Sequence, residues 1–352
     1  MFISGIGTAA PATRYTQTQC WDAVAASDHL TRLAPRSQAI LRKVLRGNNG
    51  ICSRHLAFDD LREAFAFDPD ILDARFARHA PAVASEAAAK ALTRAGLSAA
   101  DMDAIIVSTC TGYLCPGLTS YVSERLGMKP DALALDLVGQ GCGAAIPNLR
   151  TADALIASGR AERVLSICVE ICSAAMYLDD DPGVLISACL FGDGAGAMVL
   201  TAEAFEHHRR IEWTSAHTML APRDRDELRF ERRRGMLRNI LTTAVPELAA
   251  RHVDVVLRES LQQARRERRD VTAWILHAGG REILAAVRQR LDLHEDDTRW
   301  SAAVLRDYGN VSSPCVYFVL EAALADETAG GRWWMSSFGA GFSCHGALLQ
   351  VE

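Results

Sequence analysis

Several features that define common protein classes are missing from this sequence of 352 residues. No apolar run approaches the ~20 residues that a membrane-spanning helix requires. The N-terminal stretch lacks the basic start and the long apolar region of a signal peptide. The net charge of −5 provides no general attraction to nucleic acid. We therefore expect a cytoplasmic protein with no membrane span and no nucleic-acid partner.

Metal and dinucleotide signatures are missing as well. The ten cysteines include no CxxC pair, and in a cytoplasmic chain they do not predict a disulfide framework. Cys168 and Cys172 lie in an apolar run without a second ligand pair, so we expect no zinc site. The glycine-rich segment 190–200 lacks GxGxxG and precedes a strand instead of opening a helix, which argues against a dinucleotide site. The acidic segment 179–181 is more typical of a solvated turn than of a metal site.

What the chain does contain is a large apolar fraction arranged in two similar halves. Hydrophobic residues make up 49% of the sequence, enough for two domains or one large duplicated α/β unit. In each half a strand pattern runs into a glycine-marked turn with a reactive residue, and a helix pattern follows. Cys142 and His277 are predicted to occupy equivalent strand ends. We predict a duplicated α/β architecture, with halves 1–205 and 206–352 and a site where strand ends converge.

The stretch over residues 132–159 combines a strand pattern and a helix pattern around one cysteine. Apolar residues alternate at Leu133, Leu135 and Leu137, as in a strand. After a glycine-rich turn that holds Cys142, apolar residues recur at helical spacing. Free N–H groups and the positive end of the helix dipole gather at such a junction and lower a thiol's pKa. The pattern therefore predicts a nucleophilic Cys142, although most free cysteines are simply small buried hydrophobes.

Two polar residues of the second half are candidates for the groups that a nucleophile needs. His277 follows the apolar WIL, and Asn310 lies in YGNVSS. Taken alone, the first is typical of a structural histidine and the second of a turn. Together with a thiolate, an imidazole and an amide stabilise a thioester oxyanion, and also the enolate that forms when a malonyl thioester loses CO2. Glu170, inside an apolar run, is expected to be satisfied by hydrogen bonds and not to be catalytic.

Five motifs occur in order along nearly the whole chain: GQGCGAAIPNLRTA, ACLFGDGAGAMVL, ILHAGGREIL, YGNVSSPCV and FGAGF. Together they resemble the type III polyketide synthases, the chalcone-synthase-like branch of the thiolase superfamily. In this resemblance the catalytic cysteine, histidine and asparagine fall on Cys142, His277 and Asn310. The phenylalanine that guards the entrance and assists decarboxylation falls on Phe191.

The resemblance implies a five-layered αβαβα thiolase-like fold and a homodimer. It implies acyl-CoA starters, malonyl-CoA as the extender, and repeated condensation followed by cyclisation in one cavity. It implies no cofactor, because coenzyme A enters only as part of the thioester substrates. No carrier domain for phosphopantetheine is present in the chain, and none is expected.

The sequence departs from the plant members of this family at cavity positions. The family's second gatekeeping phenylalanine aligns with Asn239, and two cavity threonines fall on Cys110 and Ala175. The resemblance also assigns Ser312 and Gly341 to substrate binding. Because Ala175 is small, we expect room for an alkyl chain. The residues 169–197 resemble bacterial alkylresorcinol and alkylpyrone synthases, so we predict a fatty acyl-CoA starter and a resorcinol or pyrone product.

Three alternatives remain open at this point. A β-ketoacyl-ACP synthase III-like enzyme uses the same triad for one condensation, but usually has Gln-Ala-Asn after the histidine, where this chain has Ala-Gly-Gly. A non-enzymatic partner subunit is disfavoured because the triad is retained. A basic binding module is disfavoured by net charge and by the ordered motifs. Two arginine clusters are either solvated surface or a landing site for a phosphate-rich carrier: residues 229, 232–234 and 238, and residues 265, 266, 268 and 269.

Overall fold

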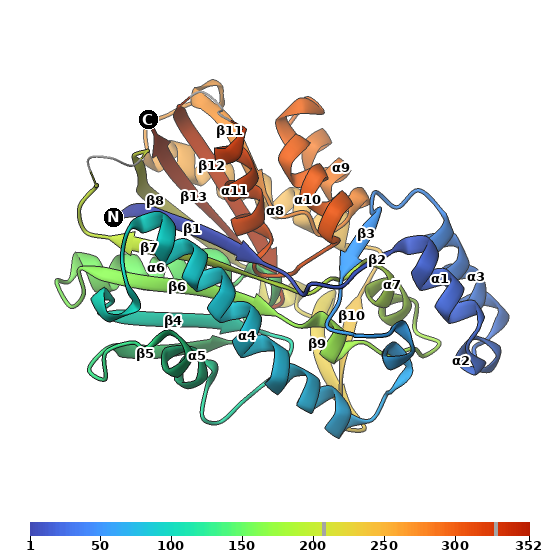
Figure 1. Cartoon of the computed structure of the whole chain (residues 1–352). Helices are drawn as coiled ribbons and strands as arrows, with labels where there is room; N and C mark the ends of the chain where they lie inside the picture. The colour runs from blue at the N-terminus through green and yellow to red at the C-terminus, as the bar shows by residue number, and fades with distance from the viewer. Residues whose placement is uncertain (206–208, 327–329) are drawn as a thin grey trace.

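One large mixed sheet runs through the whole molecule. The computed structural model describes residues 1–205, 209–326 and 330–352. The boundary predicted between residues 205 and 206 meets residues 206–208, which lie outside the described residues. Nine strands form the sheet, and Figure 1 shows them crossing the molecule. Their order is β11 (Val271–Leu276), β12 (Gly331–Gly339), β13 (Ser343–Val351), β8 (Ile211–Leu220), β1 (Phe2–Ala9), β7 (Gly194–Thr201), β6 (Arg163–Glu170), β4 (Ala104–Thr109) and β5 (Leu133–Val138).

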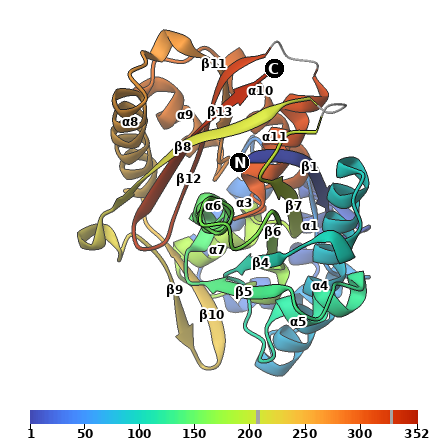
Figure 2. The ribbon, with the colours of Figure 1, turned by 90° about the vertical axis from the view of Figure 1, so that its left-hand side faces the viewer.

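Helices cover this sheet in layers. α4 (Pro69–Ala95) and α5 (Leu118–Leu126) pack on the outer face of the N-terminal half. α8 (Val245–Gln263) packs on the outer face of the C-terminal half, with α9 (Arg281–Arg290) against it. α6 (Ala145–Ala157) and α11 (Cys315–Ala325) contact strands of both halves. These two helices therefore lie between the N-terminal and C-terminal parts of the sheet and form the middle layer (Figure 2). This order of layers is that of the thiolase-like fold.

Small residues allow the closest helix–sheet contact. A methyl group added to Gly5 of β1 would lie 2.2 Å from the carbonyl oxygen of Ala91 in α4. The face of α4 that meets the sheet is rich in alanine, including Ala84, Ala87 and Ala88, all fully buried. Glycine on the strand and alanine on the helix therefore let the two backbones approach closely.

A smaller lobe is attached beside the sheet. Residues 17–46 form three helices, because Ser27 and Pro35 each begin a new one. These helices are α1 (Gln17–Ala25), α2 (Asp28–Arg32) and α3 (Pro35–Arg46), and they share an apolar core with α7 (Pro182–Leu190). Next to the lobe are the short strands β2 (Arg14–Thr16) and β3 (Ser53–His55), the helix α10 (Arg299–Tyr308), and the separate hairpin β9 (Leu228–Arg233) and β10 (Met236–Leu241).

Strand pairing defines how the two halves correspond. β4, β6, β7 and β1 pair parallel, antiparallel and antiparallel in turn, and β11, β12, β13 and β8 repeat this series. β11 therefore corresponds to β4, so His277 corresponds to the residues that follow β4, such as Cys110. Cys142 precedes α6 as Asn310 precedes α11. The predicted equivalence of Cys142 and His277 is wrong, because the described part of the C-terminal half has no counterpart of β5.

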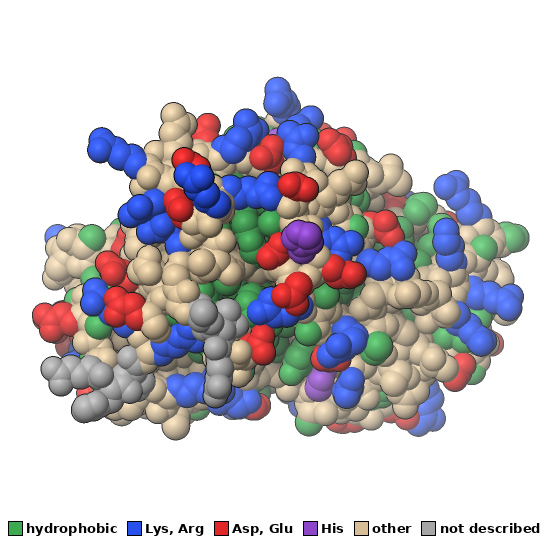
Figure 3. All heavy atoms as spheres, turned by 90° about the horizontal axis from the view of Figure 1, so that it is seen from above, with side chains coloured by type: hydrophobic (Ala, Val, Ile, Leu, Met, Phe, Trp, Pro, Cys, Tyr) green, Lys and Arg blue, Asp and Glu red, His purple; other side chains and the backbone are tan. Residues whose placement is uncertain are grey.

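The described part of the chain contains no helix long and apolar enough to cross a membrane. Its surface, seen from above in Figure 3, shows acidic and basic side chains interspersed. Ion pairs such as Arg290–Asp254, at 2.9 Å, are consistent with this mixture.

Candidate active site

Cys142 lies in a tight turn, Gly141–Gly143, between β5 and α6. The turn connecting β12 to β13 presses against it. Gly141 has φ of +56°, and a methyl group there would lie 3.0 Å from the backbone nitrogen of Ala340. A methyl group on Gly339 would lie 3.0 Å from the backbone nitrogen of Cys142. The C-terminal hairpin therefore fixes the cysteine's backbone, and only glycine fits at these contacts.

The surroundings of the Cys142 thiol favour its neutral form. Its Sγ lies 3.1 Å from Oγ of Ser312. Burial raises the pKa of the thiol to about 12; the Ser312 contact lowers the pKa, and the charge of Glu170 raises it further. The low pKa expected from the helix start is therefore wrong for this state, because desolvation exceeds what the helix end provides.

His277 directly follows β11 and is 4% exposed. Its backbone N–H donates to the carbonyl of Ser336, at 3.0 Å, and its ring meets Phe338 edge-on with centroids 5.1 Å apart. Burial lowers the pKa of the imidazole to about 4, so the ring is neutral near neutral pH. Nδ1 has no hydrogen-bond partner within the described chain. A neutral ring with an unused nitrogen is suited to meeting a substrate.

Asn310 connects the residues of the site to one another. Its Nδ2 donates to the carbonyl of Gly279, at 3.0 Å, two residues after His277. Its Oδ1 accepts from the backbone N–H of Ser312, at 2.9 Å. Its backbone pairs with that of Phe191 in an isolated bridge. The predicted triad residues are thus joined through Ser312 and Gly279, and Phe191 is fixed to the same framework.

Ser312 and Glu170 form a buried polar network beside the nucleophile. Ser312 has φ of +58°, a strained conformation for a residue with a side chain, of the kind that collects at functional sites. Its Oγ also lies 3.4 Å from Glu170 and 3.7 Å from the sulfur of Cys110. The prediction that hydrogen bonds satisfy Glu170 is confirmed. The groups that donate to Glu170 are Oγ1 of Thr109 and Thr111, the N–H and thiol of Cys110, and the hydroxyls of Ser312 and Ser313.

A small cavity adjoins this network. Phe191, Ala175, Asn239 and Ser312 line it, and its volume is about 30 Å³. Asn239 donates to Oγ of Ser187, at 3.0 Å. The walls also include residues that sequence reasoning did not single out: Cys172, Met176 and Phe230. No motif marks these positions.

Two of the residues assigned to substrate binding lie outside the lining of this cavity. Cys110 contacts Ser312 and Glu170 behind the wall. Gly341 lies in the exposed turn between β12 and β13, next to Ala340, which packs on the turn of the nucleophile. Gly341 therefore lies next to the residue that packs on the Cys142 turn, and it does not line the cavity.

A larger groove of about 530 Å³ leads to the site from the surface. Its walls come from the end of α3, from α7, from the segment after β10, and from the start of α9. Gly279 and Gly280, which follow His277 closely in the chain, line it together with Lys43, Arg281 and Glu282, and Arg281 pairs with Glu282 at 2.8 Å. Among the lining residues, none comes from the two arginine clusters.

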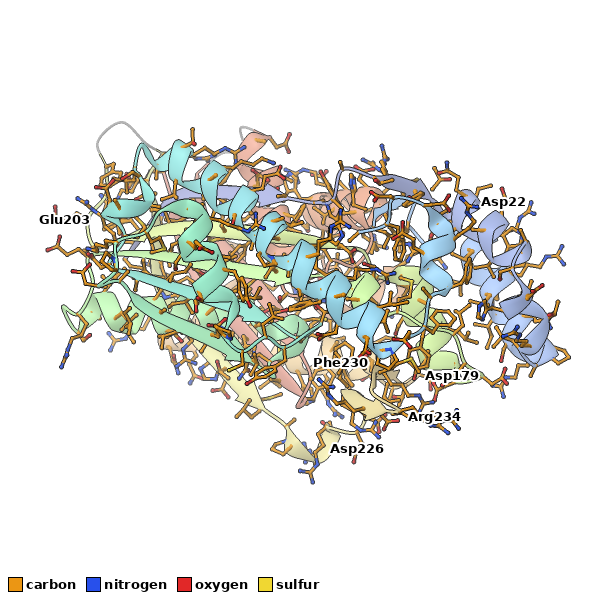
Figure 4. All side chains as sticks on the ribbon, turned by 60° about the horizontal axis from the view of Figure 1, so that its bottom comes forward. Asp22, Asp179, Glu203, Asp226, Phe230 and Arg234 are labelled. Carbon is orange, nitrogen blue, oxygen red and sulfur yellow. The ribbon has the colours of Figure 1, made fainter. Side chains whose placement is uncertain are left out.

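The β9–β10 hairpin covers the small cavity and is anchored by one arginine. Arg238 pairs with Asp179 at 3.3 Å, Asp181 at 2.8 Å and Glu231 at 2.7 Å. The acidic segment 179–181 is therefore not a solvated turn, because two of its carboxylates hold the hairpin. Figure 4 shows Asp226, in the segment before β9, and Arg234, in the turn between β9 and β10, at the periphery, and Phe230 nearer the body.

The layered architecture defines a thiolase-like protein, and comparison with known proteins gives the family. The family described as FAE1/type III polyketide synthase-like protein matches residues 12–231. The C-terminal domain of chalcone and stilbene synthases matches residues 213–351. The chain belongs to the type III polyketide synthases and is an acyltransferase.

Relatives and solved structures agree with this assignment. The chain is 29% identical to a 3,5-dihydroxyphenylacetyl-CoA synthase of Streptomyces toyocaensis, over 99% of this chain and 89% of the relative. It is 30% identical to a 1,3,6,8-tetrahydroxynaphthalene synthase of Streptomyces peucetius subsp. caesius, over 99% and 92%. The crystal structure of PKS-I from the brown alga Ectocarpus siliculosus superposes with a TM-score of 0.90 at 27% identity, covering 99% of this chain and 98% of that chain.

Proposed function

We propose that this enzyme condenses an acyl-CoA starter with several malonyl-CoA units and cyclises the product. The observation that carries the proposal is the connection of Cys142, Ser312, Asn310 and the His277 segment beside a small cavity and a larger groove. A thiol, an imidazole and an amide in one buried site suit acyl transfer without a cofactor.

Cys142 is the proposed nucleophile and His277 its base. The thiol proton moves to the neutral imidazole as sulfur attacks the starter's thioester carbonyl. The tetrahedral oxyanion collapses, and coenzyme A leaves as a thiol with the proton from the imidazolium. Since burial favours the neutral thiol and the neutral ring, the ion pair forms only when a substrate is present to consume it.

His277 and Asn310 are the proposed donors in the extension step. Malonyl-CoA loses CO2, and the two side chains stabilise the enolate oxygen that results. The enolate carbon then attacks the acyl group on Cys142: a carbon–carbon bond forms to give the extended coenzyme A thioester, the carbon–sulfur bond to Cys142 breaks, and Cys142 leaves as a thiolate. Phe191, held against Asn310 by the backbone bridge, is placed to exclude water from this step.

The groove is the proposed site of coenzyme A. Gly279 and Gly280 have no side chains, so we expect a thin chain such as pantetheine to pass them and reach His277. Lys43 and Arg281 are the cations within reach of phosphates there. Charge reversal at Lys43 is therefore expected to raise KM much more than it lowers kcat, whereas reversal at Arg266, outside the groove, leaves both unchanged.

The starter that we propose is a fatty acyl-CoA, and the product a resorcinol or pyrone. Ala175 leaves space in the cavity wall, and the neighbouring lobe is apolar. A second candidate is a short starter that yields an aromatic product without an alkyl chain. Two observations favour it: the relatives are named for dihydroxyphenylacetyl-CoA and tetrahydroxynaphthalene, and the cavity is only about 30 Å³.

The exposed edge of the sheet supports a homodimer. β5 is an edge strand with Leu133 45% and Val138 54% exposed. Tyr121 on the adjacent α5 and Tyr113 in the preceding loop are exposed as well. Soluble proteins rarely leave a free strand edge beside an apolar patch. We propose that a second copy of the chain covers this region.

The deciding experiment incubates the purified protein with malonyl-CoA and graded acyl-CoAs, followed by mass spectrometry of products and intact protein. An acyl adduct on Cys142 with products extended repeatedly supports the proposal and identifies the starter. A single extension would instead favour the ketoacyl-synthase alternative. The absence of any adduct would contradict the proposed function and favour a non-enzymatic partner role.

A further inference from the structure

A second cavity lies directly behind the one beside the nucleophile. It measures about 40 Å³ and is enclosed by the lobe of α1, α3 and α7. Its walls are almost entirely apolar and include Val24, Leu41, Leu45, Leu56 and Phe58. Each cavity holds only about two to four water-sized probes, so neither accommodates a long chain alone.

Two residues form the wall between the cavities. Met176 and Ala188 line both of them, Met176 from the segment before α7 and Ala188 from α7 itself. Methionine is unbranched and has three rotatable bonds, so it changes rotamer more readily than other apolar side chains. Ala188 contributes only a methyl group. The division thus depends mainly on the position of one flexible side chain.

The backbone beside this wall is fixed. Nη1 of Arg54 donates to the carbonyls of Ala188 and Phe191, both at 2.8 Å. Arg54 itself is 2% exposed. The end of α7 is therefore held in place while the thioether of Met176 is not. We infer that a rotation of Met176 would join the two cavities without a movement of the helix.

The path from the nucleophile leads toward this wall. Ser312, which touches Cys142, lines the first cavity, and Met176 lies on the same cavity. An acyl group on Cys142 that extends past Ser312 enters the first cavity and, if long enough, meets Met176. The apolar space beyond is suited to the methyl end of an alkyl chain.

We propose that Met176 is a specificity-determining gate, and that the cavity behind it receives the distal part of the starter's alkyl chain. The inference rests on the proposed function for the acyl group on Cys142. It adds where the chain is accommodated and which residue limits its length. The substrate class is a linear, saturated acyl-CoA whose far end is apolar.

The test measures binding and acylation separately. Thioether analogues of acyl-CoA with graded alkyl lengths are titrated by calorimetry into the wild type, Met176→Ala, Ala188→Phe and Val184→Ala. Val184 lines only the first cavity, so its truncation enlarges that cavity without joining the two. Thermal melting confirms that each variant is folded. Acylation of Cys142 by matching acyl-CoAs is followed by mass spectrometry of the intact protein.

For the wild type we expect affinity to rise about three- to fourfold per added methylene until the cavities are filled. Met176→Ala extends this rise to longer chains, Ala188→Phe ends it earlier, and Val184→Ala, which enlarges only the first cavity, shifts the end point less than Met176→Ala does. The longest acyl-CoA that acylates Cys142 should change in the same direction as the binding end point in each variant. An unchanged end point in Met176→Ala, or an equal shift in Val184→Ala, would overturn the gate.

The two proposals fail in different ways. If the wild type binds the thioethers with a chain-length limit but no acyl-CoA acylates Cys142, the proposed function is wrong. If acylation proceeds but its chain-length limit ignores Met176 and Ala188, only the gate is wrong. Loss of binding in Ala188→Phe alone, with Met176→Ala unchanged, also counts against the gate, because a gate must respond when it is removed.

Discussion

The two ends of the nine-stranded sheet differ although both are edges. β5 is exposed along its length, whereas in β11 only Thr272 is exposed. The segment that leads into α10 packs against β11. The sheet edge of the C-terminal half is thus covered by another segment of the same chain, whereas the sheet edge of the N-terminal half is open. The open edge beside exposed Leu133 and Val138 is where we propose that a second copy of the chain binds.

The correspondence of the halves also separates chemical roles. Cys142 and Asn310 occupy the same place before a middle-layer helix, and His277 occupies the place of Cys110 after a strand. One half thus holds the proposed nucleophile and the other the proposed donors. Under the proposed roles, one position of the duplicated fold serves covalent chemistry in one half and charge stabilisation in the other.

The largest expected effect tests the assignment of the nucleophile. Cys142→Ala should lower product formation by roughly 10³-fold or more, because covalent capture is lost. Mass spectrometry of the intact protein should show no acyl adduct. Cys52→Ser, at an exposed cysteine, is the matched control and should retain wild-type activity. An adduct that persists in Cys142→Ala would place the nucleophile elsewhere.

Substitution of Asn310, which corresponds to Cys142 in the other half, should reduce activity almost as much. Asn310→Asp keeps the acceptor for the Ser312 N–H but removes the amide donor. We expect malonyl-CoA decarboxylation to fall about 10²- to 10³-fold, as when one oxyanion donor is removed. Release of CO2 is the measurement. Starter acylation should fall less, and undiminished decarboxylation would separate Asn310 from the enolate.

A single charge introduced on β5 tests whether the two edges of the sheet differ in self-association. Leu133→Glu on β5 should weaken self-association about 10- to 100-fold, because an unpaired carboxylate is buried at the interface. Light scattering over a dilution series measures the change. Thr272→Glu on β11 is the control and should leave the mass unchanged. Equal effects at both edges would refute the assignment of the interface to β5.

The smallest expected effect concerns the thiol's pKa. The Glu170 charge disfavours the thiolate of Cys142, so Glu170→Gln should lower the pKa from about 12. Below that pKa the thiolate fraction rises as the pKa falls, and iodoacetamide should alkylate Cys142 roughly three- to tenfold faster at mildly alkaline pH. The pH dependence of alkylation measures this. Ser313→Ala keeps the charge and should not accelerate the reaction; slower alkylation in Glu170→Gln would contradict the electrostatic role.

The sequence predicted the elements around the site better than their environment. The strand and the helix predicted on either side of Cys142 and the strand end at His277 are confirmed, because periodicity and glycines specify local structure. The predicted low pKa of the Cys142 thiol is wrong, because the burial of the thiol depends on segments far away in the chain, such as the turn at Gly339. The roles of Met176 and Phe230 as cavity walls carry no local pattern. They arise only when the α1–α3 lobe and the hairpin pack together.

The β9–β10 hairpin has a consequence for how such an enzyme diversifies. It forms a two-stranded sheet of its own, yet it contributes Phe230 and Asn239 to the cavity. Substitutions there leave the nine-stranded sheet and its catalytic turns untouched, while Arg238 keeps the module attached. The architecture therefore allows the shape of the cavity to be changed through one small hairpin without changing the turns that carry Cys142 and His277.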